Sequence, residues 1–174
     1  MKVSDSLDMR GRLTLQKIDN RGQLLEEIKA NNSIVYTGRD LVAKLFLNVG
    51  IKPISHVAVG TGAGEVDPFK DELLKAEVYR IAIKPVDLSK QLMDYEETVT
   101  ANGSTTTQKT VRRKVIISAD LPETEPQGEP WELREAGLFN DKDPNKGVMY
   151  NRVVFPTVTK TKDFKLTLVW EIIF

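Results

Sequence analysis

The end of the chain carries the feature that most constrains its fold. From Phe164 onward the large apolar residues fall on alternate positions, and the residues between them are mixed in character. The apolar set is Phe164, Leu166, Leu168, Trp170, Ile172 and Phe174. Because successive side chains of a strand point to opposite faces of a sheet, this period of two predicts a long strand with one buried face. We expect this row of aromatic and aliphatic side chains to be buried by the chain's own fold.

The composition is that of a globular domain with a substantial core. The chain has 174 residues, of which 40% are hydrophobic and 29% charged, so we expect a single β-rich domain over 1–174. Lys and Arg number 25, as do Asp and Glu, which gives no electrostatic case for nucleic acid. Cysteine is absent, which excludes disulfides and thiolate nucleophiles. No apolar run reaches the roughly 18 residues of a membrane span, so we expect no membrane insertion.

The rest of the chain shows many short strand signals and one helix signal. Asp19–Gly22 predicts a hairpin turn, with a return strand over 23–29 that ends at Asn31–Ser33. A helix is predicted from Gly38 to about Asn48, capped by Thr37, with one apolar stripe facing the core. Further strands are predicted over 56–59, 78–86 (where Pro85 indicates a sheet edge or a strand end), 131–139 and 148–155. This pattern predicts a mainly β fold, an antiparallel β-sandwich or barrel-like domain.

Residues 93–113 predict a hairpin arm that protrudes from the domain. Asn102-Gly103 is a strong signal for a two-residue turn. Pairing outward from it sets Val99 against Thr106, Glu96 against Lys109 and Tyr95 against Thr110. The tip is rich in threonine and almost free of apolar residues, so little of it can face a core. We therefore expect a protein interface formed by Glu96, Thr98, Thr100, Thr105, Thr107, Arg112, Arg113 and Lys114.

No motif for catalysis, for a cofactor or for a metal emerges from the sequence. Gly60, Gly62 and Gly64 have the spacing G-x-G-x-G, which differs from the dinucleotide motif, and no helix pattern follows. We interpret them as a tight surface turn. His56 is the only histidine, and its apolar neighbours favour a structural role. Residues 141–147 faintly resemble a calcium loop, but two lysines oppose the charge, so an Asx-type turn is the better interpretation.

Two features leave alternatives open. Glu135 stands shortly before Gly137 and either accepts backbone N–H bonds at a bulge or faces solvent. Two groups of basic residues, one around the arm (Lys109, Arg112, Arg113 and Lys114) and one formed by Lys160, Lys162 and Lys165, are either solvated faces or a protein interface. Neither group is interleaved with the aromatic residues that single-stranded nucleic acid would stack on.

Several short motifs resemble the N-terminal region of bacteriophage tail-collar fibre proteins and phage baseplate modules. They are Ser55-His56-Val57-Ala58-Val59-Gly60-Thr61-Gly62, Glu77-Val78-Tyr79-Arg80, Leu133-Arg134-Glu135-Ala136-Gly137-Leu138-Phe139, Arg152-Val153-Val154-Phe155-Pro156 and Thr167-Leu168-Val169-Trp170-Glu171-Ile172. The resemblance spans roughly residues 33–174. In that family the module docks a fibre or its adaptor onto a contractile tail, and the fibre continues into a long shaft. Because this chain ends at Phe174, we expect a subunit other than a complete fibre.

The resemblance implies a structural, non-enzymatic subunit of a phage tail: a baseplate, collar or fibre-attachment adaptor. It would work in the virion tail, after synthesis in the host cytoplasm, through contact with other tail or baseplate proteins and with copies of itself. A receptor- or carbohydrate-binding module of a phage tail or contractile injection system is the alternative. A phage-encoded hydrolase would instead need carboxylates clustered in a cleft.

Overall fold

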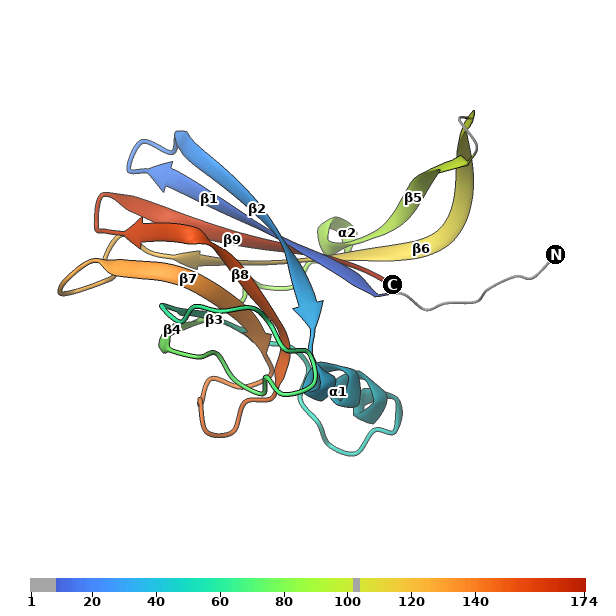
Figure 1. Ribbon diagram of the computed structural model, residues 1–174, viewed down its shortest axis with the longest axis horizontal. Helices are drawn as coiled ribbons and strands as arrows, with labels where there is room; N and C mark the ends of the chain where they lie inside the picture. The colour runs from blue at the N-terminus through green and yellow to red at the C-terminus, as the bar shows by residue number, and fades with distance from the viewer. Residues whose placement is uncertain (1–8, 102–103) are drawn as a thin grey trace.

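A single curled sheet of nine antiparallel strands, shaped as half a barrel, forms the body of the protein (Figure 1). The computed structural model describes the backbone of residues 9–101 and 104–174, and their side chains outside 96–111. The strand order is β4-β3-β7-β8-β2-β1-β9-β6-β5. The strands are β1 (Arg10–Asp19), β2 (Leu24–Ile34), β3 (His56–Gly60), β4 (Glu77–Ala82), β5 (Leu92–Ala101), β6 (Ser104–Leu121), β7 (Trp131–Phe139), β8 (Met149–Lys160) and β9 (Phe164–Ile173). The prediction of a mainly β, barrel-like fold is confirmed.

Strand β9 lies between β1 and β6 and carries the alternating residues of the C-terminus. Its apolar face, from Phe164 to Ile172, is at most 3% exposed. These residues join one core cluster with Leu13 and Leu15 of β1 and with apolar residues of β7 and β8. The prediction that the chain's own fold buries this row is therefore confirmed up to Ile172, whereas Phe174 is 39% exposed.

Strand β2 is longer than the sequence predicts. The turn at Asp19–Gly22 forms as expected, with Gly22 at a φ of 81° and its N–H bonded to Asp19 O at 3.0 Å. The predicted end at Asn31–Ser33 is wrong, because the strand runs on to Ile34. At this point β2 leaves β1, where Asn32 is opposite Gly11, and joins β8, where Ser33 is opposite Arg152. Two successive partners keep the backbone paired where side-chain propensity favours a break.

Helix α1 (Tyr36–Phe46) starts and ends about two residues before the predicted helix. Thr37 is not its cap, because Val35 holds that position and the Thr37 hydroxyl instead donates to Met149 O at 2.7 Å. The predicted apolar stripe faces the core only at its start: Leu41 is 1% exposed, whereas Phe46 is 87% exposed. A four-residue helix, α2 (Leu88–Gln91), was not predicted.

Strands β5 and β6 form a ribbon that leaves the sheet (Figure 1). Strand β6 pairs with β9 only from Lys114 to Leu121, and its earlier part pairs with β5. The predicted pairing of Val99 with Thr106 is confirmed. The prediction for Tyr95 is wrong: it lies opposite Arg112, because the register shifts between Tyr95 and Glu97. The turn at 102–103 lies outside the described residues.

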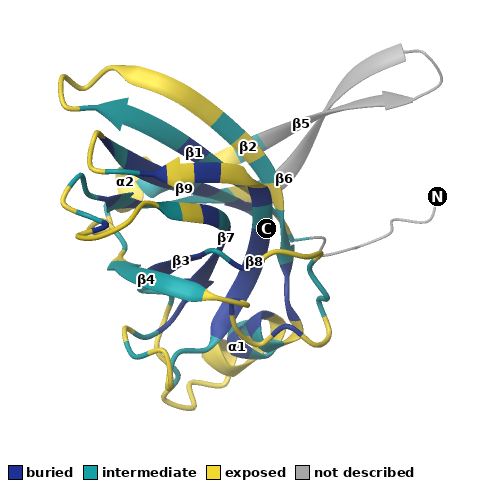
Figure 2. Ribbon diagram, turned by 60° about the vertical axis from the view of Figure 1, so that its left-hand side comes forward, coloured by how far each residue is buried: buried dark blue, intermediate teal, exposed yellow. Residues whose placement is uncertain are grey.

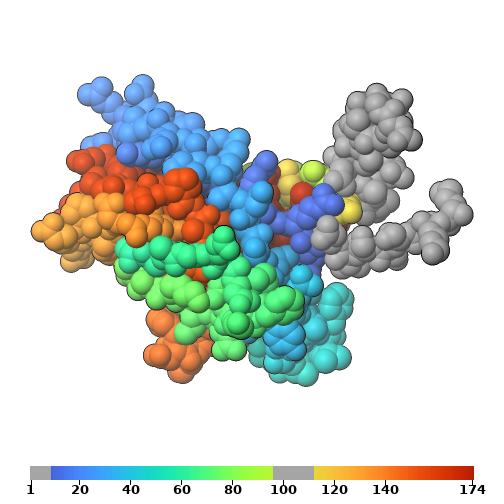
Figure 3. Space-filling view, viewed as in Figure 1, coloured from blue at the N-terminus to red at the C-terminus, as the bar shows by residue number. Residues whose placement is uncertain are grey.

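The two faces of the sheet are covered differently. The inner face holds the main core, and buried residues gather in β7, β8 and β9 (Figure 2). On the outer face, a smaller cluster that includes Ala58, Phe139 and Met149 packs against Leu74 of the loop between β3 and β4. This loop, residues 61–76, forms the green surface that covers part of the sheet in Figure 3. Strand β4 is a sheet edge, one of the two predicted alternatives, but ends at Ala82 rather than near 86.

Candidate functional site

A cluster of buried charges lies between the outer face of the sheet and the 61–76 loop. Glu135 of β7 and Arg152 of β8 belong to neighbouring strands, and the pairing of these strands shifts register between Leu133 and Glu135. Asp71 comes from the loop. The side chains of Glu135, Arg152 and Asp71 are each 0% exposed. Charged side chains are almost never fully buried unless they are paired, so this cluster is the most unusual feature of the described structure.

Glu135 uses both carboxylate oxygens to hold the loop to the sheet. One oxygen accepts from the backbone N–H groups of Gly62 at 3.2 Å and Ala76 at 2.8 Å. The other accepts from the backbone N–H of Lys75 at 3.1 Å and from Arg152 Nε at 2.8 Å. Of the two interpretations of Glu135, acceptance of backbone N–H bonds beside a strand irregularity is therefore confirmed. Because the donors lie at both ends of the loop, this one side chain closes it.

Arg152 connects Glu135 to Asp71. Its Nη1 donates to Asp71 Oδ2 at 2.9 Å and to the Glu65 carbonyl at 3.3 Å. Lys75 Nζ contacts the other oxygen of Asp71 at 2.5 Å. Burial raises the pKa of Asp71, but the bonds from Lys75, the Asp67 backbone and Arg152 outweigh it and hold the pKa below its ordinary value. Asp71 therefore stays ionised and compensates the buried guanidinium.

The glycine run after β3 fits this cluster and is not a surface turn as predicted. Gly60 and Gly62 are buried. A Cβ on Gly60 would lie 2.5 Å from Ala76 O and 2.7 Å from the Glu135 carboxylate. A Cβ on Gly62 would overlap the same carboxylate and lie 2.6 Å from Lys75 Cβ. Both positions need glycine because the Glu135 carboxylate approaches the backbone closely. Only Gly64, with a φ of 101°, is exposed and left-handed.

Arg80 forms a second, neighbouring support on the outer face. Its guanidinium pairs with both oxygens of Glu77, at 2.9 and 2.6 Å, and donates to the carbonyl of Asp141 at 2.9 Å. It also stacks over Phe139, 4.0 Å from the ring centroid. Asp141 accepts from Lys52 Nζ at 2.6 Å, and this bond and that from the Asp143 backbone lower its pKa to about 2. The turn at 141–147 is thus built from Asx-type bonds, as predicted.

The two carboxylates of the cluster are fully engaged within the chain. Every oxygen of Glu135 and Asp71 is bonded to a donor of the chain. His56 is half-buried, and burial is the first cause that lowers its pKa, followed by the charge of Arg80. Among the described side chains, those of residues 9–95 and 112–174, no three His, Cys, Asp or Glu groups converge as a metal site would require.

Most of the predicted arm interface lies beyond what the structure describes. The side chains of Glu96, Thr98, Thr100, Thr105 and Thr107 fall outside the described residues. The three remaining positions lie at the base of the arm. There Arg113 pairs with Asp94 at 2.6 Å and Lys114 with Glu171 at 3.1 Å, and Arg112 is half-buried. The interface itself remains a prediction.

The second group of basic residues, Lys160, Lys162 and Lys165, does not form one basic surface, because Lys160 is buried. Lys160 is fully buried, and its ammonium donates to the carbonyls of Pro122, Glu125 and Thr161 at 3.0, 2.5 and 2.6 Å. Burial lowers the pKa of Lys160. The sequence gives no signal for this role, because the acceptors are backbone carbonyls of the loop after β6 and of the turn after β8. Lys162 remains exposed.

Sequence reasoning also missed Arg152 and Asp71. Arg152 follows Asn151 in the middle of an otherwise apolar run from Val148 to Phe155, and a charge at such a position is a signal for a buried ion pair. Asp71 had no comparable signal, since it lies among other charged residues of a loop. Its role depends on a fold that places the loop against β8.

Neither helix in the described part of the chain is long and apolar enough to cross a membrane.

The comparisons with known proteins leave the family open. No protein-family model matches the sequence, no curated protein is significantly similar to it, and no solved structure matches the fold.

Proposed function

We propose that the chain is a structural, non-enzymatic subunit of a phage tail, a baseplate, collar or fibre-attachment adaptor that acts through protein–protein assembly. The observation that carries this proposal is the β5–β6 ribbon, which extends a sheet edge away from the body (Figure 1). An edge strand presents unpaired backbone donors and acceptors. Such an edge can pair with a strand of a neighbouring subunit.

The motifs that resemble tail proteins support the proposal because they meet in one place. Gly60 and Gly62 from the first motif and Glu135 from the third contact each other, and Arg152 from the fourth completes the cluster. Arg80 from the second motif lies over Phe139 of the third. Residues that are far apart in sequence thus serve a single purpose, the attachment of loops to the outer face of the sheet. A rigid body of this kind suits a subunit that presents an arm.

The buried charges give a second line of support. Glu135, Arg152 and Asp71 are charged groups that an enzyme could use. Both carboxylates are fully bonded inside the protein, and Arg152 is paired with them through Nε and Nη1, whereas its buried Nη2 has no hydrogen-bond partner among the described residues. What the described surface offers instead is exposed apolar side chains, among them Phe46 and Phe69, which are 87% and 84% exposed. Large exposed apolar side chains that gather in patches mark interaction sites.

Deletion of residues 97–107 tests the proposal. Because the part of β6 before Arg113 pairs only with β5 among the described strands, the shortened chain should fold with an unchanged urea midpoint. Particles should be purified from cells that produce the chain together with the other proteins of its tail, and their composition measured by mass spectrometry. We expect the full chain in the particle and the shortened chain in the soluble fraction. Normal incorporation of the shortened chain would refute the role of the arm, and absence of the full chain would refute the proposed function.

A further inference from the structure

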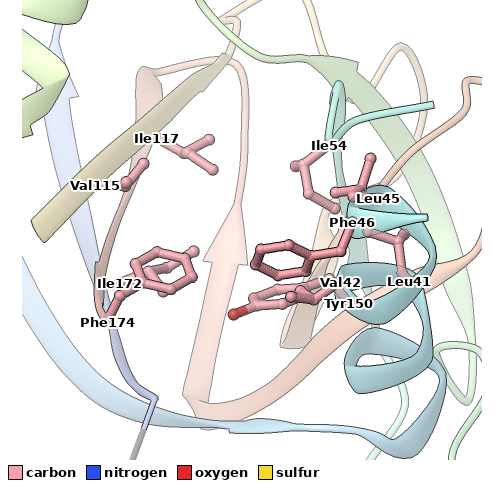
Figure 4. Close-up of a pocket in the computed structure, with 10 residues that line it drawn as sticks. All are labelled: Leu41, Val42, Leu45, Phe46, Ile54, Val115, Ile117, Tyr150, Ile172 and Phe174. Atoms are coloured by element: carbon pink, nitrogen blue, oxygen red, sulfur yellow. The ribbon is translucent and has the colours of Figure 1, made fainter. Parts of the chain in front are cut away.

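An apolar groove of about 370 Å³ opens between the end of α1 and the sheet (Figure 4). One wall consists of Val115 and Ile117 of β6 with Ile172 of β9, and the opposite wall consists of the apolar side of α1, including Val42 and Phe46. The volume falls within the range of about 300–1,000 Å³ that is usual for sites of small ligands. The groove is separate from the Glu135 cluster, which lies on the outer face of the sheet.

The floor of the groove carries one polar group, the hydroxyl of Tyr150, which points between the two walls (Figure 4). Tyr150 is 97% buried, being 3% exposed. Its hydroxyl has only one partner among the described residues, the thioether of Met9 at 4.0 Å, which is a weak acceptor. Buried phenol groups usually have a good hydrogen-bond partner. This donor is therefore available to an acceptor inside the groove.

The charge of Arg39 acts on the same hydroxyl from outside the groove, since Arg39 lines a separate hollow with Tyr36, Pro68 and Phe69. Arg39 of α1 is exposed, and its guanidinium forms no hydrogen bond or ion pair with any described residue. Its charge acts on Tyr150: burial raises the pKa of Tyr150 to about 12, and Arg39 opposes this rise. A carboxylate at the phenol would accept from it and be attracted by the guanidinium.

We propose that this groove binds a free single-chain carboxylic acid, with its carboxylate at the Tyr150 hydroxyl and its alkyl chain between the two walls. The walls supply aliphatic and aromatic contacts, and the ring of Phe46, which is 87% exposed, is placed to cover the chain. The proposal does not depend on the proposed assembly function, because either can fail without the other.

Titration of the full chain with decanoate, below the concentration at which it forms micelles, tests the proposal by calorimetry. We expect saturable binding with one site per chain. Tyr150→Phe keeps the ring and removes only the hydroxyl, so the affinity should fall about tenfold or more, as expected for a hydrogen bond to a charged group. Arg39→Gln should weaken decanoate and leave decanol, which lacks the charge, unaffected.

A matched pair of exposed positions provides the control. Phe46→Asp places a negative charge at the groove and should abolish decanoate binding, whereas Leu73→Asp, at an exposed position of the 61–76 loop, should leave it unchanged. In the unmodified chain, methyl NMR shifts on decanoate addition should concentrate at Val115, Ile117 and Ile172. Absence of saturable binding, shifts spread over the surface, or equal affinities for Phe46→Asp, Tyr150→Phe and the unmodified chain would each overturn the proposal.

Discussion

Replacement of Glu135 by glutamine should remove a large part of the stability of the protein. Each carboxylate oxygen of Glu135 accepts two hydrogen bonds, one pair from Gly62 and Ala76 and the other from Lys75 and Arg152. A glutamine side chain has one oxygen and one NH₂ group. In either orientation its NH₂ group therefore faces two buried donors, which lose their acceptor.

The expected cost follows from these contacts. An unsatisfied buried donor costs about 1–3 kcal/mol, so two of them cost roughly 2–6 kcal/mol. This range agrees with the about 3–5 kcal/mol that is lost when one partner of a buried ion pair is removed. We therefore expect Glu135→Gln to lower the free energy of unfolding by about 3–5 kcal/mol, out of a total of about 5–15 kcal/mol for typical domains.

Urea unfolding, followed by the fluorescence of Trp131 and Trp170, measures this loss. With a slope of about 2 kcal/mol per M, the midpoint should fall by roughly 2 M. Glu132→Gln is the matched control, because Glu132 lies on the same strand but is exposed, and it should change stability by at most about 0.5 kcal/mol. A loss below about 1 kcal/mol for Glu135→Gln, or one equal to that of the control, would refute the reasoning.

Three further changes probe other parts of the structure. Gly62→Ala should destabilise the protein, because the new Cβ would overlap the Glu135 carboxylate, and thermal unfolding measures the effect. Lys160→Met should lower stability by about 1–3 kcal/mol, measured by urea unfolding, because it leaves buried carbonyls without a donor. Asp141, whose pKa is lowered to about 2, should contribute stability above pH 4 that is lost as the pH falls toward 2. In Asp141→Asn the urea midpoint should therefore change less with pH over this range, as measured by urea unfolding at several pH values.

The first two of these changes have matched controls. Gly128→Ala should have little effect on thermal unfolding, because nothing lies within 4 Å of the added Cβ. Lys162→Met removes an exposed ammonium that makes one contact, to Gln127 O at 3.3 Å, and should change stability little. If either control lost as much stability as its partner, the assignment of a structural role to Gly62 or Lys160 would be wrong. An unchanged pH dependence in Asp141→Asn would contradict the account of that carboxylate.

The sequence predicted best where a local pattern and the final environment agree. The alternation from Phe164 to Ile172 gave a strand with a buried face, and the strand at 131–139 was predicted with its observed bounds. The prediction that the strand ends at Asn31–Ser33 was wrong because β2 changes its pairing partner there. Pairing with another strand can override weak propensity, and a single segment does not reveal that pairing.

The charge cluster was predicted only in part for a similar reason. A carboxylate next to a strand irregularity is a signal that its neighbours provide, and for Glu135 the observed role was one of the two interpretations that the sequence left open. Asp71 and Arg152 are separated by 81 residues, and only the path of the 61–76 loop brings them together. Lys160 is buried against backbone carbonyls, and because every residue has a carbonyl, the sequence does not mark these acceptors. The assignment of Lys160 to a basic patch, which rested on the neighbouring lysines, was therefore wrong.

The central claim, that this chain is an assembly subunit of a phage tail, is tested most directly by electron cryo-microscopy of tails purified from the source that encodes it. The account predicts density for the half-barrel at a fixed number of copies per tail, with the β5–β6 ribbon paired to a strand of a neighbouring subunit. Tails that assemble fully without the chain, or density in which the free edge of β5 and the free edge of β6 before Arg113 both face solvent, would contradict it.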